Sequence, residues 1–193
     1  SHYDFLGAVE NFFTKCAPAV FMGWSNLNFD RRMFHFNFFK GNRYPYATHS
    51  SPNSEHDGLH IARAAQTLNS ETLKTELTEA GNPSLALESL SRMQGFDTSA
   101  SHTAYVDAQN SLKVLRIIKD KHKENWDTFL KTSTKTSVET FLKNEGIYSI
   151  FENVKGRTMM YLTGTLHPNH CFHPSYASSV SYTHLTLPTM DSV

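Results

Sequence analysis

The sequence predicts an α/β protein, and three features indicate this class. A short, continuous apolar segment over 19–23 is typical of a strand that is covered on both faces, because it shows no polar alternation. Several other segments carry apolar residues at helical spacing. After Arg157, the run 158–164 changes to a strand-like pattern of Thr, Met, Tyr and Leu. Strands set among amphipathic helices predict the α/β class.

The composition is that of a folded chain. Of 193 residues, 39% are hydrophobic and 12% aromatic, which suffices for a substantial core. Lys and Arg number 18, as do Asp and Glu, so no overall positive charge indicates a nucleic-acid partner, although a local basic groove can exist in a neutral protein. The two cysteines, Cys16 and Cys171, form no disulfide framework, which favours a reducing, cytoplasmic setting. No apolar run is long enough to span a membrane.

Both ends of the chain are unusual. The first residue is Ser, and it leads directly into a helical pattern without a signal peptide, so we expect a chain that begins in mid-protein. The run 180–189 resembles the in-frame translation of a sequencing-library adapter, so we expect 180–193 to be a non-native tail. The alternative interpretation is a polar strand that ends at Pro188.

The first half of the chain is predicted to place three helices around the buried strand. Apolar residues at helical spacing predict a helix over 3–15. A second helix is expected over 30–40, where Gly41 follows as a stop signal. The stretch 42–55 is rich in Pro, Ser and Asn and is expected to be a loop. A third helix is expected over 57–68.

The second half is predicted to be mainly helical before the strand-like run. A short helix carries Leu85, Leu87 and Leu90 and ends at Gly95. The strongest amphipathic helix follows, with one apolar stripe made of Ala104, Ala108, Leu112, Leu115 and Ile118. The capping-box pattern Thr136-Ser137-Val138-Glu139 predicts a further helix that ends near Gly146.

Asp30, His102 and Asp107 are the candidate catalytic residues. Asp30 follows the buried strand, and His102 and Asp107 form a His-x-x-x-x-Asp pair at the start of the strongest helix. Carboxylates from separate elements can hold divalent metal ions on either side of a scissile phosphate. A histidine with a pKa near neutrality can serve as general base for metal-bound water. Taken singly, each residue also has an ordinary explanation: a helix N-cap, an exposed turn residue and a solvated helix residue, respectively.

The order and context of these residues resemble bacterial exonuclease I, of the DEDDh exonuclease superfamily. The run Gly23-Trp24-Ser25-Asn26-Leu27-Asn28-Phe29-Asp30 is similar to the second motif of that family. The resemblance continues over Tyr44-Pro45-Tyr46, Asp57, Pro83-Ser84, Leu87-Glu88, 101–107, 126–130 and 161–164. Nearly all of the chain before Val180 is therefore covered.

The resemblance implies a ribonuclease H-like exonuclease domain that lacks its first strands, followed by a helical linker and the start of a small β-barrel domain. We expect the exonuclease domain over 1–120, the linker over 121–150 and the barrel start over 151–179. The implied activity is 3′-to-5′ digestion of single-stranded DNA to nucleoside monophosphates, with a role in DNA repair and recombination.

The resemblance also implies the roles of the site residues. Asp30 and Asp107 would be ligands of Mg²⁺, with Mn²⁺ as an alternative, and His102 would be the general base. The implied partners are single-stranded DNA and single-stranded-DNA-binding protein, in a bacterial cytoplasm and without a membrane. The chain departs from the family because it lacks an Asp-x-Glu pair on an earlier strand. We therefore expect little or no nuclease activity from this chain by itself.

Other functions remain open at this point. The chain is also compatible with a DEDDh exoribonuclease, or with a non-catalytic module that binds single strands. Phe36 and Phe39 lie on a different helical face from the expected core residues Phe34 and Phe38, and exposed aromatic rings can stack on bases. The segment 167–173 holds three His and one Cys, but its spacing matches no standard zinc finger, so a metal site is not favoured.

Overall fold

A computed structural model describes residues 1–99, 103–145, 147–164 and 185–188. The helices are α1 (His2–Cys16), α2 (Asp30–Lys40), α3 (Gly58–Leu68), α4 (Leu87–Met93), α5 (Ala104–Lys121), α6 (Lys123–Lys131) and α7 (Lys135–Asn144). The strands are β1 (Val20–Gly23), β2 (Ser54–Asp57), β3 (Ile147–Val154), β4 (Arg157–Gly164) and β5 (Leu185–Pro188). The predicted mixed α/β class is confirmed. No helix among the described residues is long and apolar enough to cross a membrane.

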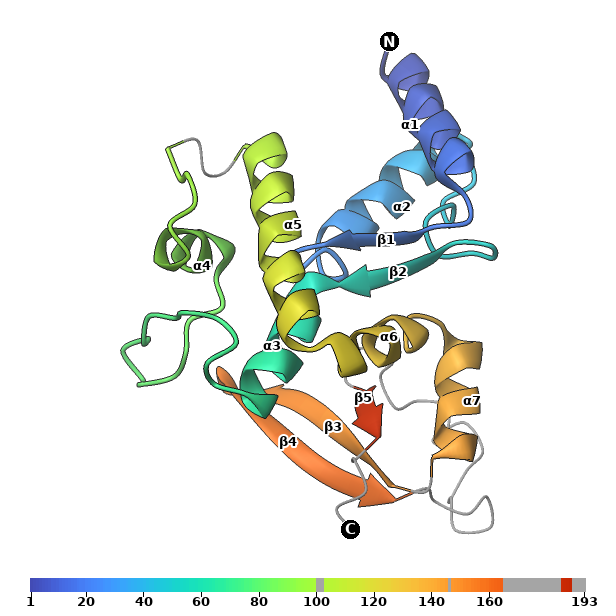
Figure 1. The fold of residues 1–193 in the computed structure, drawn as a ribbon. Coiled ribbons are helices and arrows are strands. Elements are labelled where there is room, and N and C mark those ends of the chain that lie inside the picture. Colours follow the sequence, from blue (N-terminus) through green and yellow to red (C-terminus); the bar gives the residue numbers. More distant parts are fainter. Residues whose placement is uncertain (100–102, 146, 165–184, 189–193) are drawn as a thin grey trace.

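The strands β1 and β2 form a parallel pair that organises the first part of the chain. Their register runs from Val20 opposite Ser54 to Gly23 opposite Asp57, so both strands end at the same edge. The segment that leads to α2 leaves β1 at this edge, and α3 leaves β2 there. Helix α5 crosses in front of the same strand ends (Figure 1). In parallel sheets this edge is where loops and helix starts bring side chains together.

The strand β2 corrects the prediction that 42–55 is a loop throughout. Ser54 and Glu55 belong to this strand, and all of its residues are buried although the run Ser-Glu-His-Asp is polar. The burial of the two carboxylates, Glu55 and Asp57, is tolerated because both have hydrogen-bond partners. The Glu55 carboxylate accepts a hydrogen bond from Thr48 Oγ1 at 2.6 Å and pairs with Arg31 Nε. Hydrophobic patterning could not find a strand of this kind.

The main core lies between α3, α4, α5 and α6. Ile61 of α3, Leu90 of α4, Ile118 of α5 and Phe129 of α6 are each fully buried there. The predicted stripe of α5 is confirmed in part, since Leu115 and Ile118 are buried whereas Leu112 is 49% exposed. Leu112 lies instead along a cleft, as described below.

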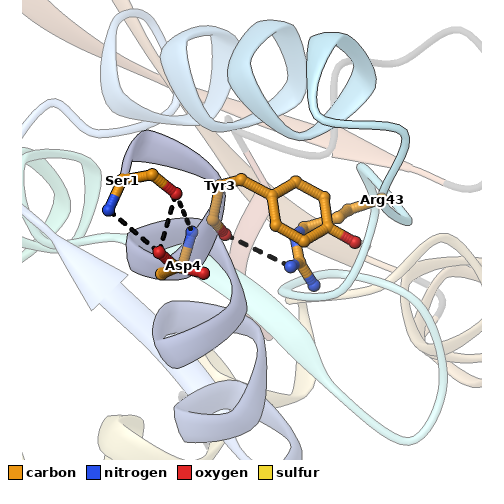
Figure 2. Close-up of polar contacts among 4 residues, drawn as sticks. All are labelled: Ser1, Tyr3, Asp4 and Arg43. Carbon is orange, nitrogen blue, oxygen red and sulfur yellow. Dashed lines mark hydrogen bonds and ion pairs between the residues drawn. The ribbon is translucent and has the colours of Figure 1, made fainter.

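A smaller core joins α1 to α2, and Arg43 strengthens the attachment. Leu6 and Phe13 of α1 pack with Phe38 of α2. The Arg43 guanidinium lies 4.2 Å from the centre of the Tyr3 ring, and Nη2 donates to the Tyr3 carbonyl at 3.2 Å. Figure 2 shows this contact beside the N-terminal cap of α1, where Ser1 Oγ accepts from the Asp4 amide and donates to the Asp4 carboxylate. Helix α1 is therefore held at its first turn as well as through its apolar face.

The start of helix α7 differs from the capping box that the sequence predicted. The N-cap is Thr134, whose Oγ1 accepts from the Ser137 amide at 3.1 Å, while the Ser137 hydroxyl reaches back to Thr134. The predicted pair Thr136 and Glu139 lies inside the helix instead. The sequence holds two overlapping capping patterns, one that begins at Thr134 and one that begins at Thr136. The pattern that begins at Thr134 forms the cap.

The later strands form an antiparallel sheet in the order β4-β3-β5. The β3–β4 hairpin turns at Lys155 and Gly156, which have φ values of 49° and 82°. The predicted strand after Arg157 is confirmed as β4. Its partner β3 begins at Ile147, inside the range expected for the helical linker. β5 pairs with β3 through Leu185 and Pro188, and the non-native origin of 180–193 stays a prediction.

Candidate active site

A cleft of about 840 Å³ lies between the end of β1, α2 and α5. It is bounded by polar and charged side chains on these elements and by aromatic residues of α1, β1 and α2. The polar and charged residues along it are Asn26, Asp30, Arg31, Thr48, Glu55, Asp107, Ser111, Arg116 and Lys119. Two of the three residues predicted to form the active site, Asp30 and Asp107, therefore reach the same cleft.

Asp30 is the first residue of α2 and is exposed along this cleft. The N-cap of the helix is Phe29, which makes no side-chain capping bond. The alternative interpretation of Asp30 as an N-cap is therefore wrong. A carboxylate in the first helical turn is favoured electrostatically by the positive end of the helix dipole. This position leaves the carboxylate available to a ligand in the cleft.

Asp107 lies in the first turn of α5 and also lines the cleft. It is half-buried rather than fully solvated, and its amide donates to the Thr103 carbonyl at 3.0 Å. Asp107 is therefore a helix residue that is partly solvated. The third predicted residue, His102, falls outside the described residues, as does the cluster His167–His173.

Asn26 is a site residue that the sequence did not single out. It is 9% exposed, and its Oδ1 has no hydrogen-bond partner among the described residues. It lies along the same cleft as Asp30 and Asp107. A buried amide oxygen without a partner is uncommon and indicates a ligand-facing position. Its position could not be recognised from the sequence, since asparagine is common in turns.

A third carboxylate in the cleft, Glu55, is already engaged. Its side chain is 4% exposed and is held between Thr48 and Arg31. Nearby, His35 and His49 have ring centres 4.9 Å apart, and burial lowers the pKa of both, although Glu55 opposes this shift. Over the described ranges, no group of three or more His, Cys, Asp or Glu side chains could hold a metal ion. The metal-binding role predicted for Asp30 and Asp107 therefore stays a prediction.

The donor set nevertheless fits a hard cation. The carboxylates of Asp30 and Asp107 and the amide oxygen of Asn26 are the ligand types that Mg²⁺ prefers. Magnesium also keeps several water ligands, so it needs only one or two protein carboxylates. The cleft wall formed by α5 adds two exposed cations, Arg116 and Lys119, which suit a phosphate-bearing ligand.

The chain is similar in sequence and in fold to one enzyme among known proteins. No family model matches the sequence. The chain is 26% identical over 119 residues to exodeoxyribonuclease I of Haemophilus influenzae, which covers 61% of this chain and 25% of that protein. The fold matches the crystal structure of E. coli exonuclease I in complex with a dA16 oligonucleotide, with a TM-score of 0.73 and 20% identity, over 86% of this chain and 37% of that chain. An ExoI/SSB-Ct complex matches with a TM-score of 0.70 and 20% identity, over 87% and 37%.

By sequence and by fold, this chain is a relative of exodeoxyribonuclease I. The resemblance that the sequence indicated is therefore confirmed. The chain spans about a quarter of the length of the curated relative and just over a third of the solved structures.

Proposed function

We propose that this chain is part of a 3′-to-5′ exonuclease that hydrolyses single-stranded DNA to nucleoside monophosphates, in DNA repair and recombination. The observation that carries this function is the convergence of Asp30 and Asp107 on one cleft from α2 and α5. The similarity to exodeoxyribonuclease I, one structure of which holds a dA16 oligonucleotide, supports DNA as the substrate. The cations Arg116 and Lys119 on the same cleft wall suit its phosphates.

Asp30 and Asp107 would hold Mg²⁺, or Mn²⁺ in its place, and Asn26 would face the same ion or its water ligands. A bound divalent ion stabilises charge on a reacting phosphate and lowers the pKa of a bound water. We assign His102 as the general base on the resemblance alone. The residues of this chain would orient the ion and the phosphate, with Asp30 and Asp107 approaching from separate helices.

We further propose that the 193-residue chain by itself digests DNA poorly. Among the described residues, Asp30 and Asp107 reach the cleft besides the engaged Glu55, and a two-metal reaction needs more ligands than these two supply. A 5′-labelled single strand with Mg²⁺ should stay intact with this chain. A longer protein that contains it should release mononucleotides and lose at least about a hundredfold in rate on Asp107→Ala. Mg²⁺-dependent digestion by this chain, abolished by Asp107→Ala, would refute the proposed inactivity.

Competition experiments separate the other two functions. An exoribonuclease would digest RNA in preference to DNA of the same sequence. A non-catalytic binding module would bind single strands equally well with and without metal, and Asp30→Ala would not change its affinity. We expect neither result, because two carboxylates that reach one cleft from separate helices favour metal-dependent chemistry over simple binding of a polyanion.

The architecture beyond the mixed α/β class is also proposed. The parallel pair β1–β2 with helices packed around it supports a ribonuclease H-like domain over 1–120. The hairpin β3–β4 supports the start of a β-barrel after the helical linker. A partnership with single-stranded-DNA-binding protein is proposed on the likeness to the ExoI/SSB-Ct complex.

A further inference from the structure

The Asp57 carboxylate is fully buried, faces three backbone amides and lies outside the cleft. It is 0% exposed and is the last residue of β2. Oδ1 accepts from the Leu59 amide at 2.9 Å and from the Ser25 amide at 2.8 Å. Oδ2 faces the Leu27 amide at 3.4 Å. No role in the reaction was predicted for Asp57 from the sequence.

Only one of these contacts is explained by helix capping. Asp57 is the N-cap of α3, and a cap needs a single bond to an amide of the first turn, here that of Leu59. The other two contacts reach the segment 24–29, which leaves β1 and leads into α2. The same carboxylate therefore joins two chain segments that emerge side by side from the parallel strands.

The segment 24–29 needs this support. Ser25 has a φ of 58°, in the left-handed region that side-chain-bearing residues seldom adopt. The N-cap of α2, Phe29, makes no side-chain bond that would fix the start of its helix. The remaining side-chain anchor is the Trp24 indole, which donates to the Leu85 carbonyl at 3.2 Å. Asp57 thus supplies the acceptors that hold the middle of the segment.

The start of α3 packs closely against the end of β1 and the segment 24–29. A Cβ added at Gly58 would lie 3.0 Å from the Gly23 carbonyl oxygen and 3.2 Å from the Trp24 ring. A Cβ added at Gly23 would lie 2.9 Å from Asn26 Cβ. Glycines at the two strand ends let the backbones approach closely enough for the Asp57 carboxylate to reach across.

We propose that Asp57 is a positioning residue for the candidate metal site: it fixes the segment 24–29 and thereby the place of Asn26 and Asp30 at the cleft wall. This inference rests on the proposed function. Asp57 touches neither metal nor substrate. Its role resembles that of groups that orient metal ligands from behind, whose loss costs roughly 10–100-fold in metal affinity.

The substitution Asp57→Ser separates this role from capping. Serine caps helices about as well as aspartate, so α3 keeps its cap, but the hydroxyl is too short to reach the Ser25 and Leu27 amides as well. The control is Thr134→Ala, which removes the cap of α7, far from the cleft in sequence and attached to a different core cluster. Both variants should fold, and thermal unfolding verifies it.

The readouts are amide hydrogen exchange and Mn²⁺ binding by the 193-residue chain. In Asp57→Ser, exchange at Ser25 and Leu27 should accelerate at least about tenfold while Leu59 stays protected, and Mn²⁺ affinity should fall about tenfold. Thr134→Ala should change neither. Unchanged Mn²⁺ affinity in a folded Asp57→Ser variant would overturn the positioning role, whatever the exchange rates. Absence of Mn²⁺ binding in the wild type would contradict the proposed function itself, and this role with it.

Discussion

At the scale of single residues, the cleft shows how a buried carboxylate differs from a functional one. Asp30 lies exposed at the start of α2, and its carboxylate has no hydrogen-bond or ion-pair partner among the described residues. Glu55, in the same cleft, is held by Thr48 and Arg31. A carboxylate that is fully satisfied by protein partners contributes to stability, whereas one that faces a cleft is free to bind a ligand.

The first prediction concerns Glu55. Replacing it with Gln leaves the partly buried Arg31 without its counter-charge, and we expect a loss of roughly 1–3 kcal/mol in the free energy of unfolding. The matched variant is Glu76→Gln, which removes the partner of Arg92 at the surface. It should cost less, because water screens that pair. Chemical denaturation of both variants measures the difference, and equal losses would contradict the role given to Glu55.

Asp30 and Asp107 could be predicted from the sequence, whereas Asn26 could not. Each had an ordinary explanation, and the resemblance to exonuclease I identified them as a pair before any geometry was known. Asn26 could not be found in the same way, because its significance lies in a buried oxygen without a partner, which depends on packing. Asp57 was noticed only as a point of resemblance, since Ser25 and Leu27, which it contacts, are 32 and 30 residues away in the sequence.

At the scale of elements, apolar periodicity predicted the helices well and the strands unevenly. The bounds of α2 and the start of α5 agree with the sequence, because Gly41 after α2 and the apolar spacing of α5 are local signals. β2 was missed because its side chains are polar and buried by specific partners. β3 begins three residues after α7 ends, within the range assigned to a helical linker. Such boundaries depend on tertiary contacts rather than on local pattern.

The second prediction tests the corrected start of α7. Thr134→Ala should lower the free energy of unfolding by about 1 kcal/mol, because the first-turn amide of Ser137 loses its acceptor. Thr136→Ala should change it little, since Thr136 is exposed inside the helix. Urea denaturation of the two variants distinguishes them. A larger loss from Thr136→Ala would restore the capping box that the sequence predicted.

The third prediction concerns the close approach of the two parallel strand ends. Gly58→Ala places a Cβ 3.0 Å from the Gly23 carbonyl oxygen, and backbone atoms there cannot swing aside as a side chain would. We expect a loss of roughly 1–3 kcal/mol in stability. Gly81→Ala is not a suitable control. A Cβ at Gly81 would meet nothing within 4 Å, but the φ of 75° there is unfavourable for alanine. Thermal unfolding of Gly58→Ala should therefore be compared with the wild type, and an unchanged midpoint would contradict the close packing.

At the scale of the whole molecule, buried histidines make stability depend on pH. Burial is the largest cause of the lowered pKa of His35, His49, His56 and His122. For His35 and His49, Glu55 raises the pKa and Arg31 lowers it. Below the ordinary value of 6.5, the unfolded chain therefore binds protons that the folded chain does not. Stability rises with pH through this window and is lost as pH falls.

The fourth prediction follows from that sign. The unfolding midpoint should drop between pH 7 and pH 5, and His49→Asn should reduce the drop by removing one of the buried groups that titrate. At pH 7.5 the variant and the wild type should differ mainly by lost packing against His35 and Tyr46. Calorimetry across this range checks both points, and a midpoint that rises toward pH 5 would show that the linkage has the opposite sign.

The central claim is that Asp30 and Asp107 bind one divalent cation together, and a Mn²⁺ titration with a double-mutant cycle tests it most directly. The wild-type chain, Asp30→Asn, Asp107→Asn and the double variant are titrated at pH 7.5, with thermal unfolding as the check on folding. If both carboxylates hold the ion, each single variant should weaken Mn²⁺ binding about tenfold or more, and the double variant should lose less than the sum of the two effects. Single variants that bind Mn²⁺ as tightly as the wild type would contradict the account.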